Sequence, residues 1–327
     1  MPRRRLPRPS PLTAKKATIV SFINYKGGVG KTTTTYHIAC ALAYYHDKKV
    51  LMVDIDPQTN LTFLCVDYDS WKRFKTTNGT IATLYSKFRK RQTLDIHRVI
   101  WQAPIGRGRS TKIDNVDLIP CDLDLLGEDL GGTVLSSPTV PANVFQALKQ
   151  GARSALREWF FLQEVLGPVV HKYDYVLIDC PPNLYLMTQN ALVASDFYVI
   201  TTIPEYLSVV GLTILQQKIQ NITEKLKHMA SLAGKKAPDV ARLGGIIFVK
   251  VRVGGALITR QHEGQMSRMR EEYPQYCFEA YTTELIGYSE AAEARMPVWL
   301  TLTSAAERAA QKREYELITE EFLRRIP

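Results

Sequence analysis

The stretch Asn24-Tyr25-Lys26-Gly27-Gly28-Val29-Gly30-Lys31-Thr32-Thr33 decides how the rest of this chain is interpreted. An apolar, β-branched run, 17–23, precedes it, and the segment 32–45 carries apolar or aromatic residues at helical spacing. A strand, a glycine-rich turn and a helix form the context of a phosphate-binding loop, in which backbone N–H groups and the helix N-terminus face an anion. In such a loop Lys31 would reach the β- and γ-phosphates, and the Thr32 hydroxyl would bind Mg²⁺.

The stretch departs from the ordinary P-loop pattern G-x-x-x-x-G-K-S/T, because Tyr25 stands where the first glycine is expected. A second lysine, Lys26, precedes the glycines instead. This pattern resembles the deviant Walker A motif K-G-G-x-G-K-T of the ParA/MinD family of ATPases. The resemblance implies that Lys26 reaches the nucleotide of a partner subunit. It also implies that ATP is held by Lys26, Gly27, Gly28, Val29, Gly30, Lys31, Thr32 and Thr33.

A second apolar run, 49–54, ends in carboxylates at Asp54 and Asp56. Carboxylates at the carboxyl end of a parallel strand face the ligand crevice of an open α/β sheet. The segment Asp54-Ile55-Asp56-Pro57-Gln58 resembles the D-x-D-P-Q motif of the same family. That resemblance implies that Asp56 orients or activates the attacking water and that Asp54 supports the Mg²⁺ environment.

A third apolar run, Tyr175 to Ile178, leads directly into Asp179, which suits a fully buried parallel strand with an acid at its tip. This is a Walker B arrangement, in which Asp179 would bind Mg²⁺ through water. The following Pro181-Pro182 resembles the second switch of the family. The sequence therefore names Thr32, Asp54 and Asp179 as the metal site, and Lys26, Lys31 and Asp56 as catalytic residues.

Further segments predict one doubly wound, mostly parallel sheet with helices on both faces, the P-loop NTPase fold of the deviant Walker A class. Residues 17–327 are expected to form one ATPase domain after a disordered basic tail, 1–16, with 72–112 as a basic, insert-like segment. Besides the three runs above, strands are expected at 115–120, 197–202 and 244–251. Helices are expected at 81–94, 142–167, 206–233, 258–272 and 305–325, and 127–142 is expected to be a loop.

The formal net charge of +10 is unevenly distributed along the chain. The tail carries +6, and the segment 72–112 carries eleven Lys/Arg against the single acid Asp95, so the remainder is acidic. Local basic charge favours a polyanionic partner, although ordinary solvated lysines stay an alternative. Candidate DNA contacts are Lys87, Arg89, Lys90 and Arg91 in the middle of the chain, and Arg252, Arg260, Arg268 and Arg270 toward its end.

Several patterns argue against a membrane or secreted protein. No run of about 18 apolar residues exists, and the basic tail lacks the apolar stretch of a secretory signal. Five cysteines without metal-ligand spacing suit a reducing cytosol. The final helix mixes acids with bases, unlike the basic amphipathic anchor of MinD-type proteins. We expect a cytoplasmic, nucleoid-associated protein that does not bind membranes.

The resemblance implies a Mg²⁺-dependent ATPase that forms a homodimer on ATP binding, coats DNA non-specifically and is stimulated by a ParB-like partner. Partition of plasmid or chromosomal DNA is the commonest role of this kind. A positioning ATPase for a protein cargo and a protein-binding regulator with little turnover stay open as alternatives. A tyrosine kinase of the related bacterial type is a third, although this chain ends without a tyrosine-rich tail.

Overall fold

The computed structural model describes residues 17–106, 111–125, 144–254, 257–302 and 304–327. The predicted tail 1–16 and the predicted loop 127–142 lie outside these ranges. Within them, seven parallel strands form the central sheet, which confirms the predicted α/β fold. Their spatial order is β3 (Val116–Ile119), β2 (Val50–Asp54), β4 (Tyr175–Asp179), β1 (Thr18–Ile23), β5 (Phe197–Thr202), β6 (Arg242–Val251) and β9 (Cys277–Thr283).

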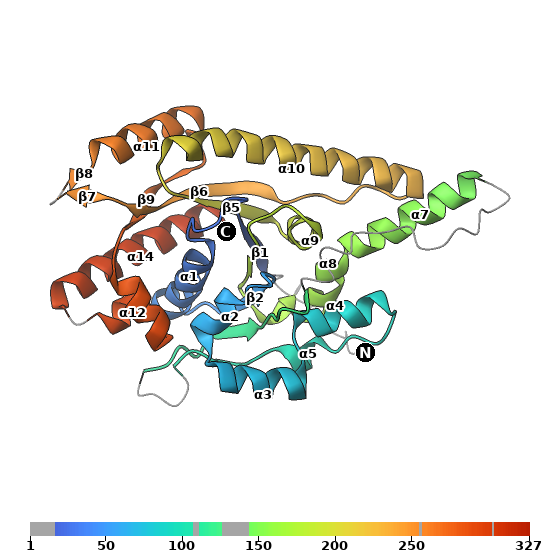
Figure 1. Ribbon diagram of the computed structural model, residues 1–327, viewed down its shortest axis with the longest axis horizontal. Helices are drawn as coiled ribbons and strands as arrows, with labels where there is room; N and C mark the ends of the chain where they lie inside the picture. The colour runs from blue at the N-terminus through green and yellow to red at the C-terminus, as the bar shows by residue number, and fades with distance from the viewer. Residues whose placement is uncertain (1–16, 107–110, 126–143, 255–256, 303) are drawn as a thin grey trace, which may run out of the picture.

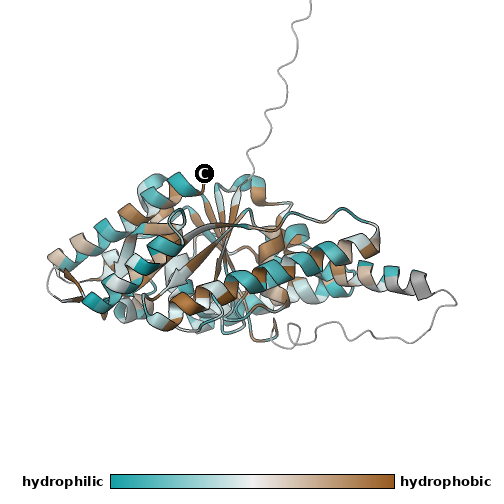
Figure 2. Cartoon of the chain, turned by 90° about the horizontal axis from the view of Figure 1, so that it is seen from above, coloured by the Kyte–Doolittle hydropathy of each residue, from teal (hydrophilic) through white to brown (hydrophobic). Residues whose placement is uncertain are grey.

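Helices cover both faces of this sheet (Figure 1), and Figure 2 shows hydrophobic strands in the middle with hydrophilic surfaces on the outer helices. One face packs against α1 (Lys31–His46), α2 (Asn60–Cys65), α12 (Gly287–Ala294), α13 (Val298–Thr301) and α14 (Ala305–Arg325). The other packs against α4 (Ile81–Arg89), α5 (Ile96–Val99), α8 (Phe161–Leu166), α9 (Leu186–Ala194), α10 (Tyr206–Ala233) and α11 (Arg260–Glu272). Smaller elements are α3 (Tyr68–Asn78), α7 (Val144–Trp159), the 3₁₀ turn η1 (Val170–Lys172) and the hairpin β7 (Val253–Gly254) with β8 (Leu257–Ile258).

Most predicted elements are confirmed, and β5, α10 and α14 have the expected bounds. The expected helix 81–94 is shorter, because α4 ends at Arg89. The expected helix 142–167 is two helices, since Phe160, with φ −101° and ψ 7°, interrupts it between α7 and α8. The last strand, β9, was not predicted. Among the described residues, no helix is both long and apolar enough to cross a bilayer.

The helix after the phosphate loop is fixed by a buried histidine. His37 donates from Nδ1 to the Thr33 carbonyl (2.7 Å) and accepts the Val298 N–H at Nε2 (3.1 Å). Burial lowers the pKa of His37 to about 4, so the imidazole is neutral at physiological pH and this pair of hydrogen bonds requires that form. His37 therefore joins the first turn of α1 to α13 across 261 residues of sequence.

Candidate nucleotide-binding site

The carboxyl ends of the central strands gather the predicted site residues. β4 pairs with β2 on one side and β1 on the other, so Asp54 lies opposite Asp179 and Phe22 lies opposite Asp179 in the ladders. The loop after β1 therefore lies next to both acidic strand ends. This is the crevice in which open parallel sheets bind their ligands.

Two glycines give the phosphate loop its curvature. Gly28 and Gly30 have φ angles of 73° and 71°, a left-handed conformation that costs other residues energy. A Cβ on Gly30 would also lie 3.2 Å from Val249 Cγ2. Gly30 caps α1 without a side-chain hydrogen bond, so the first amides of the helix are left for a ligand. An anion with several acceptor oxygens fits this arrangement.

Lys31 begins α1 and is buried at the floor of the loop. Its amine donates to the Lys26 carbonyl at 3.3 Å. Burial lowers the pKa of Lys31, and the charges of Asp179 and Asp56 oppose this shift. A buried ammonium whose neighbours are carboxylates and a single carbonyl retains donor capacity for phosphate oxygens.

Asp179 is fully buried at the tip of β4, and neither of its carboxylate oxygens accepts a hydrogen bond from the described residues. Burial, with the charge of Asp54 close by, raises the pKa of Asp179 well above its ordinary value, and the positive charge of Lys31 opposes this shift only in part. A buried carboxylate without hydrogen bonds fits a role in holding a cation. No group of three or more His, Cys, Asp or Glu side chains in the described ranges could hold a metal alone. Mg²⁺ at this position would therefore need oxygens from a nucleotide and from water.

Comparison with known proteins agrees with this geometry. A family model described as an AAA domain matches residues 17–232. A ParA family protein of Chlamydia pneumoniae is 34% identical over 212 residues, covering 64% of this chain and 68% of the relative. The chain belongs to the ParA/MinD family of ATPases. The chromosome partitioning protein ParA of Caulobacter vibrioides is 30% identical over 226 residues, covering 68% of this chain and 70% of the relative. A variant of Cyanothece McdA in complex with ATP has a similar fold, with a TM-score of 0.64 at 20% identity over 94% of this chain and 96% of that one.

Asp54, by contrast with Asp179, has both carboxylate oxygens occupied by hydrogen bonds. Oδ1 accepts the Asp56 N–H (3.1 Å), and Oδ2 accepts the Thr62 N–H (2.9 Å) and hydroxyl (2.6 Å). These bonds hold the backbone that carries Asp56, whose Oδ1 in turn accepts the Gln58 N–H at 3.0 Å. Burial raises the pKa of Asp56, opposed by the nearby charge of Lys31. In this ParA/MinD family member, Asp54 therefore shapes the loop that presents Asp56.

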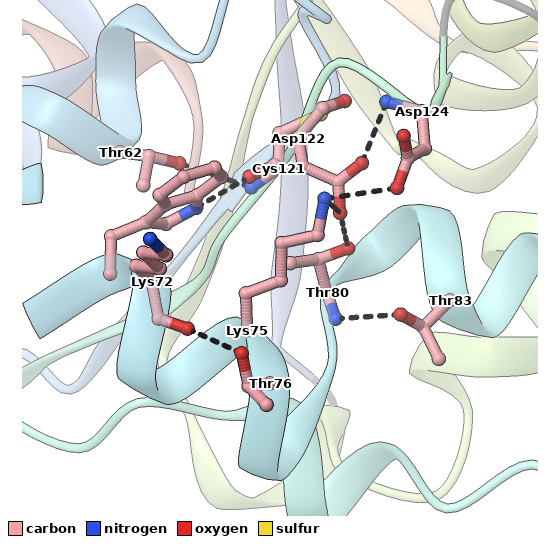
Figure 3. Close-up of polar contacts among 10 residues, drawn as sticks. Thr62, Lys72, Lys75, Thr76, Thr80, Thr83, Cys121, Asp122 and Asp124 are labelled. Carbon is pink, nitrogen blue, oxygen red and sulfur yellow. Dashed lines mark hydrogen bonds and ion pairs between the residues drawn. The ribbon is translucent and has the colours of Figure 1, made fainter. Parts of the chain in front are cut away.

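Thr62 also connects this loop to the outer part of the chain. Its hydroxyl oxygen accepts the Cys121 N–H at 3.0 Å, and the Cys121 carbonyl accepts the Trp71 indole N–H at 3.0 Å. Figure 3 shows the neighbouring contacts, in which Lys75 lies 3.5 Å from Asp122 and Asp122 accepts the Thr80 hydroxyl. A continuous hydrogen-bond network thus runs from Asp54 to α3.

Replacing Thr62 with valine is expected to destabilise the protein by about 1–3 kcal/mol, because Asp54 would lose a donor in a buried site. Urea denaturation measures this loss. Thr76→Val is the matched control, since its hydroxyl lies at an exposed position of α3 and donates to the Lys72 carbonyl. The control is expected to change stability by at most about 0.5 kcal/mol. Equal losses in the two variants would show that the Thr62 hydroxyl has no special role.

Three residues at the phosphate loop were not among the predicted site residues. Asn24 anchors the loop to β5 by donating to the Thr201 carbonyl at 2.9 Å. Lys250, with φ 52° at an irregularity between β6 and β9, donates to the Gly28 carbonyl at 3.0 Å. The Glu205 carboxylate lies 3.4 Å from the amine of Lys26, whose side chain is partly exposed. No local sequence signal identifies Lys250, because only the irregular strand pairing directs it to the loop.

The two predicted groups of DNA contacts lie at different ends of the molecule (Figure 1). The first group, Lys87 to Arg91, lies at the carboxyl end of α4. The second lies on α11 and, in the case of Arg252, directly after β6. In that second group Arg252 pairs with Glu284 (2.9 Å) and Arg270 with Glu279 (3.5 Å). The structure therefore does not unite the two groups into one surface.

Proposed function

We propose that residues 17–327 act as one Mg²⁺-dependent ATPase domain that forms a homodimer when it binds ATP. The observation that carries this proposal is the position of Lys26. Its amine lies 3.4 Å from the Glu205 carboxylate and its side chain is 39% exposed, so it is accessible to a nucleotide on another molecule. A lysine supplied in trans would complete the charge stabilisation that phosphoryl transfer needs.

An apolar stripe beside Lys26 supports the dimer. The first half of α10 exposes Tyr206 (58%), Leu207 (67%), Val210 (44%) and Ile214 (45%) at helical spacing. Large exposed apolar residues gathered on one surface mark an interaction site. Because Glu205 immediately precedes this helix, a second copy docked on the stripe would lie against the mouth of the phosphate loop.

Each residue of the site would have a separate role in ATP hydrolysis. Lys31 and the first amides of α1 would bind the β- and γ-phosphates, while Thr32 and Asp179 would hold Mg²⁺, which supplies charge neutralisation when bound. Asp56, fixed through Asp54, would orient the attacking water. Lys26 of the second chain would stabilise the charge that develops on the transferred phosphoryl group. Turnover is then slow until dimerisation and an activator complete the site.

We further propose that the ATP-bound dimer binds DNA non-specifically and partitions plasmid or chromosomal DNA, with a ParB-like protein as its activator. The protein would be cytoplasmic and nucleoid-associated, and it would not bind membranes. The relative named as a chromosome partitioning protein supports this role. Non-specific DNA binding requires only Lys and Arg contacts to phosphates, and its affinity falls steeply with salt.

DNA binding of the purified protein with ATP, with ADP and without nucleotide, across a salt series, tests this function. ATP-dependent binding to unrelated duplexes, with a linear decline on a log–log salt plot, is the expected result. If ATP drives dimerisation but the protein does not bind DNA, the partition role is wrong. The protein would then be a positioning ATPase that moves a protein cargo without DNA, or a protein-binding regulator. Transfer of phosphate to tyrosine would instead indicate the kinase alternative.

A further inference from the structure

We propose that duplex DNA binds to a basic surface at the end of the molecule that is distant from the phosphate loop. This surface is formed jointly by α4, α7 and the second half of α10. The inference rests on the DNA-binding function proposed above and names the surface responsible. We call this surface the basic end. It consists of Lys87, Arg89, Lys90, Arg91, Lys149, Arg153, Arg157, Lys218, Lys225, Lys227, Lys235 and Lys236.

Packing brings these three segments together although they are distant in sequence. α7 and α10 share an apolar cluster that includes Leu156, Trp159 and Leu226. Arg153 of α7 donates to the Ala233 carbonyl at the end of α10 (3.3 Å), and Lys225 lies 5.6 Å from the Trp159 ring.

The end of α4 joins the same assembly through two contacts to α7. Arg157 stacks on the Phe88 ring at 4.0 Å and donates to the Phe88 carbonyl at 2.7 Å. Arg89 lies 4.0 Å from Glu158. The three segments therefore form one continuous end of the molecule, at the right of Figure 1.

The charge of this end is strongly one-sided. Along 81–91, 144–159 and 214–236, the sequence has twelve Lys and Arg but only two acids, Glu158 and Glu224. Glu158 pairs with Arg89, and Glu224 pairs with Lys227 at 2.9 Å. α11 differs, because its three arginines are matched by Glu263, Glu271 and Glu272. A concentrated positive surface attracts a polyanion far more strongly than a balanced one.

The apolar residues of the basic end favour DNA over a lipid bilayer. Within 81–91, 144–159 and 214–236, the described large apolar side chains that are exposed are Leu232, at 39%, and Ile214, at 45%, which ends the apolar stripe. A membrane-binding surface combines cations with several bulky apolar residues that enter the lipid. Backbone binding to DNA requires cations alone. The partner that fits this surface is therefore the phosphate backbone of a duplex.

The position of the basic end separates DNA from the nucleotide. α10 begins next to Glu205, the partner of Lys26, and extends for 28 residues. At 1.5 Å per residue, its far end lies about 40 Å from the phosphate loop. DNA at the basic end would leave both the loop and the apolar stripe uncovered, so the ATP-bound dimer would present two basic ends at once.

Matched charge reversals test the assignment. Lys90→Glu/Lys236→Glu changes the basic end, and Arg260→Glu/Arg268→Glu makes the same charge change on α11. All four side chains are exposed, and none has an ion pair within the described ranges. Fluorescence anisotropy with a labelled duplex of arbitrary sequence, in ATP, measures affinity from low to high salt. Basal ATP turnover and the ATP-driven change in mass, both measured without DNA, check that each variant is intact.

The basic-end variant is expected to lose at least about tenfold in DNA affinity at ~100 mM salt, with a salt slope shallower by about 2 per protomer. The α11 variant is expected to stay within about threefold of wild type. Unchanged DNA binding by the basic-end variant, or an equal loss in the α11 variant, would overturn the assignment while the proposed function stands. If the wild-type protein does not bind the labelled duplex in ATP, the proposed DNA-binding function is wrong as well. Binding to phosphatidylglycerol vesicles that is lost in the basic-end variant, with DNA binding retained, would reassign the surface to a membrane.

Discussion

Lys31→Ala is expected to lower ATP turnover at least about 100-fold, because it removes a preorganised cation from the site where phosphate charge develops. Nucleotide affinity is expected to fall by about 10–100-fold, the range of a lost hydrogen bond to a charged group. Steady-state phosphate release and isothermal titration calorimetry with ATP measure the two effects. Lys31 is buried, and the charges of Asp179 and Asp56 act on its amine.

Lys48→Ala is the matched control for this variant. Lys48 lies just after α1, and its side chain makes no hydrogen bond or ion pair within the described ranges, so its loss is expected to leave turnover and affinity unchanged. Thermal unfolding of both variants shows whether the fold is retained. A folded Lys31→Ala protein that hydrolysed ATP at the wild-type rate would refute the assignment of the phosphate loop.

Lys26→Ala is expected to separate nucleotide binding from hydrolysis. Because the Lys26 amine pairs with Glu205 at 3.4 Å and is proposed to act on the nucleotide of a second chain, the variant should bind ATP as a monomer with nearly wild-type affinity. Its ATP-driven dimerisation and its turnover should fall, with turnover lower by about 100-fold if the lysine stabilises the transition state in trans. Light scattering and phosphate release distinguish this pattern from the loss of binding expected for Lys31→Ala.

Lys250→Ala supplies the comparison, because its amine bonds the same loop at the Gly28 carbonyl within one chain. Its loss is expected to weaken nucleotide binding by less than about tenfold, the cost of one ordinary hydrogen bond, while ATP-driven dimerisation persists. If Lys26→Ala instead weakened ATP binding by the monomer as strongly as Lys31→Ala, Lys26 would act within its own chain and the trans proposal would fail.

The sequence predicts the centre of this fold well because local signals and the final structure coincide there. β1, β2 and β4 are continuous apolar runs that end in functional residues, and the glycines of the loop occupy the positions that need a positive φ. The approach of Asp54 to Asp179 follows from the family resemblance and the parallel sheet order.

Elements that depend on distant contacts could not be predicted. β9 carries Glu279 in its middle, and α14 supports it through Glu321, whose carboxylate accepts the Glu279 and Ala280 N–H groups at 3.0 Å. α3 has no fully buried residue, and its Trp71 and Phe74 are only partly buried against the core. The basic end could not be recognised from the sequence as one surface, because its charges come from three segments that only the topology brings together.

If two chains share the nucleotide site, the mass of the protein in solution depends on the nucleotide that it binds. Light scattering is measured with Mg²⁺ and either a non-hydrolysable ATP analogue, ADP or no nucleotide. We expect the mass of one 37.0 kDa chain with ADP or without nucleotide, and twice that mass with the analogue. A mass that does not respond to the ATP analogue would contradict the proposed trans role of Lys26.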